Sequence, residues 1–317
     1  MPHDWFRAAI CLVLALILSA CSLGGAPPED ARLKIGLIPV VDTVPVYVAD
    51  QKGYFKAQGI TVQLVPVKGA QERDALMQAG EIDGMLTDLV AVGLFNRDKV
   101  QLKAVTTARR SSPASPMFRV VAAPGAGIAS AMDLAGVPVA ISHNTVIQYV
   151  TERLLAAQGL SVDQIKETEV SAIPVRFEQL MNGQLKAATL PDPMGQGALA
   201  AGAQLIVDDG AYAQYAQTVL CFSQAAIGAK PTTIRKFLKA WALAVSDVNR
   251  SPGQFADLLI EQGRVPDSIR GSYQMPVFST GDVPTQAEWE DVVNWLMDKQ
   301  LIDRPLAYGD SIQKMGE

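Results

Sequence analysis

Short apolar runs alternate with amphipathic stretches along most of the chain after residue 32. Strand patterns at 33–38 and 61–66 are each followed by a helix pattern, the first of them at 44–51. Gly80 closes the second helix pattern, and a short strand pattern at 84–86 follows it. This order predicts strand–helix–strand units whose strands are parallel.

A second unit of the same kind follows a segment rich in Ser and Pro. Its strand patterns lie at 119–123, 137–142, 169–172 and 186–190, and its helix patterns lie at 145–158 and 174–183. The order around Gly183 repeats that around Gly80: a helix, a glycine, a short link, a strand and a nearby aspartate. Glycine caps are common, so ordinary helix–strand geometry explains this match as well as kinship does. Two similar α/β lobes are predicted, with a ligand cleft between the carboxyl ends of their strands.

The last third of the chain has a helical pattern. One apolar stripe follows Pro231, and another follows the capping-box sequence Thr285-x-x-Glu288. The tryptophans of these stripes are Trp241, Trp289 and Trp295. Their helical spacing among aliphatic residues favours packing in a core over stacking on a ligand.

Composition narrows the class of protein. The chain has 317 residues, of which 49% are hydrophobic and 19% charged, and its formal net charge is -5. This size allows one large domain or two smaller ones, and the charge favours neither nucleic acid nor an anionic membrane as a partner. The 3 Cys and 2 His are scattered, so we expect no metal site and no cofactor.

The first residues have the pattern of a lipoprotein signal peptide. The apolar run at 8–18 is shorter than the roughly 20 residues that cross a bilayer as a helix. The sequence Leu-Ser-Ala-Cys that ends at Cys21 resembles a bacterial lipobox. We predict that residues 1–20 are removed, that Cys21 is lipidated and that 21–32 form a tether. The protein is then anchored to the bacterial cell membrane and faces the periplasm or the cell exterior.

Segments of the body resemble a known family. The segment 52–60, which reads KGYFKAQGI, and the segment 79–83, which reads AGEID, are similar to substrate-binding proteins of ABC importers. These are the receptors for nitrate, sulfonates, taurine and thiamine pyrimidines (NMT1/SsuA-like). The likeness also covers 181–193 and extends from 283 to 308, so it spans most of the chain after the signal peptide.

The resemblance implies a type II periplasmic-binding-protein fold, an α/β architecture of two lobes with a hinge and an interlobe ligand cleft. Lobe 1 would comprise 33–112 and the returning segment 221–317, and lobe 2 would comprise 113–220. Such a receptor, a monomer, closes around a small molecule and delivers it to a membrane permease and its ATPase. It does not convert the molecule chemically.

Loops that follow the strands of both lobes supply the candidate ligand contacts. In lobe 1 they are Asp42, Thr43, Lys68, Thr87 and Asp88, and in lobe 2 they are His143, Asn144, Thr145, Asp192 and Met194. Several precede helices, whose N-terminal N–H groups can hold an anionic or polar group. Thr43, Asp88 and Asn144 are equally well explained as helix N-caps. His143 is as readily a donor to backbone as a ligand contact.

The charges at these positions bear on the class of ligand. Asp42, Asp88 and Asp192 would repel a simple oxyanion, and only two basic side chains, Lys68 and His143, compensate. Carboxylates accept hydrogen bonds from N–H groups. A nitrogen heterocycle such as a thiamine-precursor pyrimidine, or an amine, is therefore favoured over nitrate, a sulfonate or taurine.

Three other functions fit parts of the pattern. Eukaryotic pyrimidine synthases share the resemblance, but this chain lacks their cysteine-rich motif and any G-x-S-x-G nucleophile motif, so we expect no catalytic residue. Cys221 is expected to be a small buried hydrophobe. A sensory lipoprotein that reports to a signalling partner, and a structural lipoprotein with an unused cleft, stay open. The structural lipoprotein would show no stabilisation by any ligand.

Overall fold

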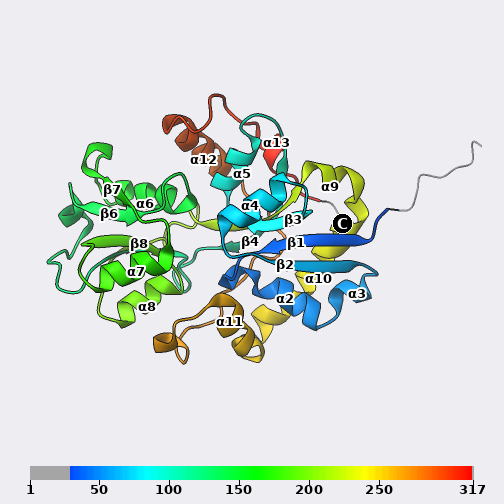
Figure 1. The fold of residues 1–317 in the computed structure, drawn as a ribbon, viewed down its shortest axis with the longest axis horizontal. Helices are drawn as coiled ribbons and strands as arrows, with labels where there is room; N and C mark the ends of the chain where they lie inside the picture. Colours follow the sequence, from blue (N-terminus) through cyan, green and yellow to red (C-terminus); the bar gives the residue numbers. More distant parts are fainter. Residues whose placement is uncertain (1–28, 316–317) are drawn as a thin grey trace, which may run out of the picture. The chain divides into compact units, whose positions relative to one another are not determined.

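Two five-stranded sheets organise the computed structural model, which describes residues 29–315 (Figure 1). The predicted signal peptide, the lipobox and Cys21 lie outside the described residues. The chain from Ala31 onward forms one compact unit. Within the described range, the helices are too short or too polar to cross a bilayer.

The first sheet has the strand order β2-β1-β3-β10-β4. Its strands are β1 (Arg32–Leu37), β2 (Thr61–Pro66), β3 (Gly84–Thr87), β4 (Leu102–Arg110) and β10 (Gln217–Ser223). The first three are parallel, and β10 lies antiparallel between β3 and β4.

The second sheet has the equivalent order, β7-β6-β8-β5-β9. Its strands are β5 (Phe118–Ala122), β6 (Pro138–Ile141), β7 (Lys166–Glu169), β8 (Ala187–Pro191) and β9 (Gln204–Asp208). Here β5 is the antiparallel strand, between β8 and β9. The chain passes between the sheets from β4 to β5 and back from β9 to β10, so two linkers, 111–117 and 209–216, join them. The predicted α/β class with two similar halves is confirmed. The first half is the first sheet with its helices, residues 32–110 and 217–315, and the second half is the second sheet with its helices, residues 118–208.

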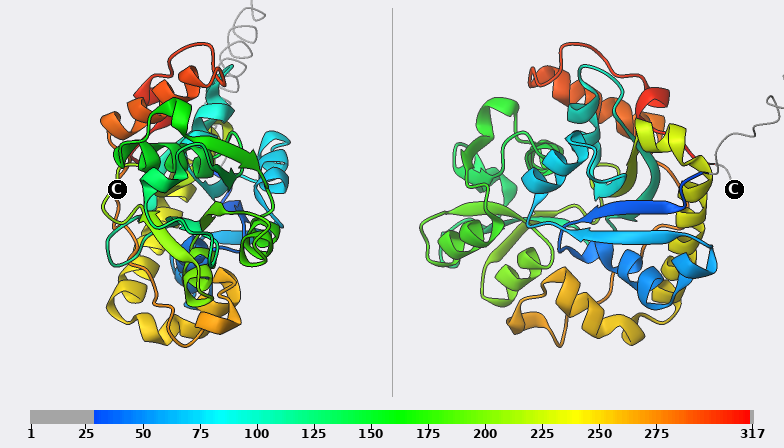
Figure 2. Two further views of the ribbon diagram at one scale, coloured as in Figure 1. Left: turned by 90° about the vertical axis from the view of Figure 1, so that its left-hand side faces the viewer. Right: turned by 45° about the vertical axis from the view of Figure 1, so that its right-hand side comes forward.

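Helices cover both faces of the first sheet (Figure 2). On one face lie α2 (Val44–Gln51), α3 (Tyr54–Ala57), α10 (Pro231–Arg250) and α11 (Ala256–Gly263), and on the other lie α5 (Leu89–Asn96), α12 (Gln286–Asp298) and α13 (Tyr308–Ser311). Successive residues of β10 point to opposite faces, as the strand geometry requires. Leu220 packs with the α10 side, and Cys221, free and buried as predicted, packs with the α5 side.

The second sheet is also covered on both faces. The helix α6 (Val146–Ala157) packs on one face, and α7 (Ile173–Met181) and α8 (Met194–Ala200) pack on the other. The remaining elements are α4 (Ala70–Gln78), α9 (Gln224–Ala229) and the short 3-10 turns η1 (Val41–Thr43), η2 (Ala131–Leu134), η3 (Val162–Gln164), η4 (Pro252–Phe255) and η5 (Asp267–Ile269).

The helices α4 and α7 are equivalent in the two halves. Each is followed by a glycine in the left-handed region, Gly80 at φ 71° and Gly183 at φ 72°. This backbone conformation is sterically unfavourable for a residue that has a Cβ atom. Each also holds a buried arginine that donates from Nη1 to a backbone carbonyl 13 residues further along the chain. Arg73 donates to Leu86 O (3.1 Å), and Arg176 donates to Thr189 O (2.7 Å).

Several predicted elements coincide with the observed ones. The bounds of α2 and β2 are as predicted, the capping box of Thr285 and Glu288 is formed, and the tryptophans of α10 and α12 are buried. The predicted strand at 169–172 is wrong, because β7 ends at Glu169. This strand lies at the edge of the second sheet, where a polar sequence such as KETE is tolerated.

Candidate functional site

Loops and helix N-termini from both halves meet near the two linkers. The helix α5, which follows β3, contacts α6, which follows β6. The helix α8, which follows β8, contacts η5 of the first half. The carboxyl-end loops of the two sheets are therefore the elements that position the candidate site.

Asp42 is buried against an arginine that the sequence analysis did not include. Its Oδ1 lies 3.2 Å from Nη1 of Arg109, the next-to-last residue of β4. Arg109 also donates from Nη2 to the hydroxyl of Ser115 (2.9 Å) and to Pro116 O (3.1 Å) in the first linker. Burial alone would lower the pKa of Arg109, but Asp42 offsets this and the pKa is raised. The carboxylate of Asp42 is thus neutralised within the protein.

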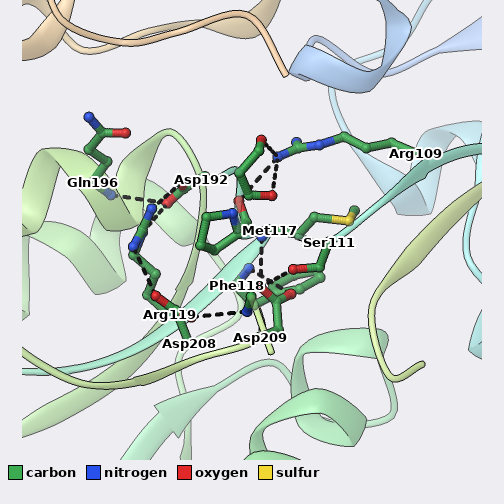
Figure 3. Close-up of polar contacts among 12 residues, drawn as sticks. Arg109, Ser111, Met117, Phe118, Arg119, Asp192, Gln196, Asp208 and Asp209 are labelled. Carbon is green, nitrogen blue, oxygen red and sulfur yellow. Dashed lines mark hydrogen bonds and ion pairs between the residues drawn. The ribbon is translucent and has the colours of Figure 1, made fainter. Parts of the chain in front are cut away.

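Asp192 has an arginine partner as well (Figure 3). Arg119 of β5 donates to both carboxylate oxygens, from Nε at 2.8 Å and from Nη2 at 2.9 Å. The backbone N–H of Gln196 donates to the same carboxylate at 3.1 Å, and Asp208 lies 3.3 Å from Arg119 Nη1. This two-pronged, buried pairing leaves Asp192 little capacity to accept a bond from a ligand.

The third aspartate, Asp88, is the N-cap of α5. It accepts a hydrogen bond from Ala91 N at 2.9 Å, and burial raises its pKa. The prediction that only Lys68 and His143 compensate these carboxylates is therefore wrong, because Arg109 pairs with Asp42 and Arg119 pairs with Asp192. In sequence, Arg109 is one of two adjacent arginines at the end of a strand, and Arg119 is the single charged residue near the start of an apolar strand.

The other predicted residues of the first half take varied positions. Thr43 is buried at the N-cap position of α2, but its hydroxyl donates to Val40 O (2.7 Å) and makes no cap bond. Lys68 is exposed, and its backbone N–H donates to Glu72 (2.8 Å). Thr87 is buried at the end of β3, and its hydroxyl has no partner among the described residues.

In the second half, Thr145 is the N-cap of α6, since its hydroxyl accepts from Ile147 N (3.1 Å). Asn144 precedes it at φ 58° and is exposed, so the alternative that Asn144 is the cap is wrong. His143 is exposed, with Nδ1 3.2 Å from Glu169 Oε2. Met194 is half-buried at the start of α8.

One pocket is lined by both halves and by the second linker. Its residues are Leu89 and Val90 of α5, Val146 and Tyr149 of α6, Val292 of α12, and Gln214, Tyr215 and Gln217. It has room for about one water molecule. Gln217 is buried, yet neither atom of its carboxamide has a hydrogen-bond partner among the described residues. Gln217 is not among the residues predicted from sequence, where its only signal is an amide at the start of a buried strand.

Polar contacts between α6 and α12 close one side of this pocket. The hydroxyl of Tyr149 donates to Asp291 Oδ2 at 2.6 Å, and Arg153 Nε donates to the same oxygen at 2.9 Å. Trp295 Nε1 donates to Glu152 Oε2 at 3.0 Å. We call this set of contacts the α6–α12 bridge. It joins the two halves outside the linkers.

Glu167 of β7 lies beside this bridge and should make stability depend on pH. Burial and the neighbouring Glu152 raise its pKa from 4.5 to about 7. The folded state then binds the proton more tightly than the unfolded state, so stability is lost as pH rises from about 4.5 to about 7. In Glu167→Gln, we expect the free energy of unfolding to exceed that of the wild type by about 1 kcal/mol at pH 8, after allowance for solvent screening.

Urea unfolding at pH 4 and at pH 8 measures this difference. The two proteins should be equally stable at pH 4, where both carry a neutral group at this position. Glu178→Gln, which changes an exposed carboxylate of α7, is the control. A Glu167→Gln protein that follows the wild-type pH profile would contradict the assignment.

Comparisons with known proteins bear on this site. A family model described as NMT1/THI5 like matches residues 41–254. No curated protein sequence matches the chain. Among solved structures, the alkanesulfonate-binding protein SsuA from Xanthomonas axonopodis pv. citri, bound to MOPS, is similar with a TM-score of 0.73 and 16% identity over 91% of this chain and 100% of that chain.

Two other structures are similar to a comparable extent. The periplasmic aliphatic sulphonate binding protein SsuA from Escherichia coli has a TM-score of 0.73 and 16% identity over 88% of this chain and 96% of that chain. DszB in complex with biphenyl-2-sulfinic acid has a TM-score of 0.68 and 14% identity over 90% of this chain and 97% of that chain. At these identities the likeness establishes the fold, and the predicted periplasmic-binding-protein architecture is confirmed.

Proposed function

The chain belongs to the NMT1/THI5-like family, and on that premise we propose that it is an extracytoplasmic solute-binding protein that serves an ABC importer. It binds a small molecule between its two halves and releases it, unchanged, to a membrane permease and its ATPase. The similarity to two SsuA proteins whose names include sulfonate binding supports this role.

The observation that carries the proposal is the pocket between α5, α6 and the second linker. Its walls are mostly apolar, and the carboxamide of Gln217 lines it without a hydrogen-bond partner in the part of the chain that the structure describes. A buried amide without partners costs free energy, which a bound polar group recovers. Because both halves supply the walls, a change in the angle between them would open the pocket and admit a larger solute.

The lobes of this receptor would be those predicted, joined by the two linkers as a hinge. We place the return to lobe 1 at Gln217 instead of residue 221, since β10 pairs with β3 and β4. The protein would be a monomer, anchored by lipid at Cys21 to the bacterial cell membrane and facing the periplasm or the cell exterior.

The preference for a heterocycle or an amine, which was drawn from sequence, loses its basis once the partners of the aspartates are known. That preference rested on three free carboxylates, but Asp42 and Asp192 are bound to arginines and Asp88 caps α5. We therefore propose an organic anion of the sulfonate class. A catalytic role for Cys221 has no support, since the thiol is buried and burial raises its pKa well above 9.0.

Thermal unfolding in the presence of single solutes tests the function. The panel comprises alkanesulfonates, taurine, nitrate, aminopyrimidines and amines. A solute at 100 times its Kd should add about 2.7 kcal/mol to the free energy of unfolding. Absence of stabilisation by every member would count against a solute receptor and favour a structural lipoprotein.

Gln217→Leu should weaken binding of the stabilising solute about tenfold, because a hydrogen bond from the pocket is lost. The solute-free variant should be at least as stable as the wild type, since two unpartnered polar atoms have gone. Isothermal titration calorimetry gives the affinity, and Gln204→Leu, at the exposed start of β9, is the control. Unchanged affinity in a folded Gln217→Leu protein would remove this pocket from the site.

A further inference from the structure

Arg176 is fully buried in α7 and its bonds are to neutral oxygens. Nε donates to Val170 O (2.9 Å), Nη1 donates to Thr189 O (2.7 Å), and Nη2 donates to the hydroxyl of Ser142. Ser142 and Val170 stand just beyond the carboxyl ends of β6 and β7, and Thr189 lies within β8, two residues before its end. The guanidinium therefore lies directly beneath the loops that the second half contributes to the candidate site.

No carboxylate of the described residues forms an ion pair with Arg176, which sets it apart from its equivalent in the first half. Arg73 occupies the same position in α4, and the next residue, Asp74, lies 2.7 Å from its Nη2. In α7 the next residue is Phe177. Glu169, whose charge is felt by Arg176, is itself engaged by His143 N (2.7 Å) and by the hydroxyl of Ser171.

A buried charge without a counter-ion is costly, and hydrogen bonds to neutral oxygens shield it only in part. Burial lowers the pKa of Arg176 to about 10. At neutral pH the guanidinium still carries its proton, so the edge of the second sheet holds a buried positive charge that Glu169 offsets only at a distance, without an ion pair. An anion bound at this edge would neutralise it.

We propose that Arg176 is a specificity-determining residue, whose unpaired charge selects an anionic solute at the loop that joins β6 to α6. This inference rests on the proposed function. Ser142, bonded to the guanidinium, begins that loop, and the N-terminus of α6, with its Thr145 cap, ends it. The dipole of this 12-residue helix adds to the same potential. Arg176 acts through space on the solute and through Ser142 on the loop.

Phe177→Asp tests the charge without removing the arginine. The change recreates beside Arg176 the carboxylate that Asp74 supplies to Arg73. Phe177→Asn is the matched control, since it removes the same ring and adds no charge. The probes are butanesulfonate and butanesulfonamide, which have the same chain but differ in charge at neutral pH. Calorimetry on the full chain gives the ratio of their affinities.

The wild type should prefer the sulfonate. Phe177→Asp should reduce this preference by about tenfold, as expected when a nearby unit charge is cancelled, whereas Phe177→Asn should leave it unchanged. Arg176→Gln should reduce the preference as Phe177→Asp does, and Arg176→Lys should restore it. If the role of Arg176 is purely structural, Arg176→Gln should weaken the binding of both probes equally and leave the ratio of their affinities unchanged.

Two results would overturn the inference alone. One is an equal ratio in Phe177→Asp and Phe177→Asn, which decides the matter even where Arg176→Gln fails to fold. The other is a wild type that binds only uncharged or cationic solutes, which would leave the solute-binding function intact. A protein that is stabilised by no solute would overturn both proposals.

Discussion

Replacing Asp209 with alanine should lower the free energy of unfolding by about 3–5 kcal/mol, because three buried donors lose their acceptor. Asp209 begins the second linker and is fully buried. Its carboxylate accepts from Ser111 Oγ (2.7 Å), Met117 N (2.8 Å) and Phe118 N (3.1 Å), all at or beside the first linker (Figure 3). One side chain thus fastens the two linkers to each other.

Urea unfolding followed by circular dichroism at pH 7 measures this loss. Asp209→Asn should lie between the wild type and Asp209→Ala, since the amide keeps one acceptor oxygen. A loss below about 1 kcal/mol in Asp209→Ala would mean that water replaces the carboxylate, and that the linkers are not fastened by it.

The second large effect is expected for Asp192→Ala, which should cost about 3 kcal/mol of stability because it leaves the charge of Arg119 buried with a weaker partner. Asp208, at 3.3 Å, is the remaining carboxylate. The double variant Arg119→Met, Asp192→Ala should recover part of this loss, since both charges are removed. Denaturant unfolding of the wild type and of the two variants measures both the loss and its recovery.

A different outcome would restore the prediction from sequence that Asp192 binds the solute. In that case Asp192→Ala keeps its stability but loses affinity for the stabilising solute. Measuring unfolding and binding on the same protein separates the two roles.

Local pattern was enough to place much of the fold. The helix α2 and the strand β2 follow from periodicity, and the cap of α12 follows from Thr285 and Glu288. The position of β10 in the sheet does not follow from local pattern. Its partners β3 and β4 lie more than a hundred residues earlier, and antiparallel pairing leaves no local signal in the sequence. The position of β7 could not be predicted from hydrophobicity, because a strand at the edge of a sheet does not need apolar residues.

The site was only partly predictable for a related reason. The sequence placed Asp42 and Asp192 after strands, where ligands bind in this architecture, but their chemical roles depend on partners 67 and 73 residues away. The lack of an ion partner for Arg176 among residues 29–315 is equally invisible in sequence, since it depends on where the carboxylates lie in three dimensions. The net charge of the loops at the candidate site therefore cannot be read from sequence until the positions of the arginines in the fold are known.

The burial of Cys221 in β10, an inner strand of the first sheet, has a practical consequence for spectroscopy. It is the only cysteine after Cys21, and its thiol is shielded from reagents in the folded protein. Cysteines introduced at Val162 (79% exposed) in the second half and at Val277 (69% exposed) in the first can therefore be labelled selectively. A fluorescent donor and acceptor at these positions would report the angle between the halves in single molecules.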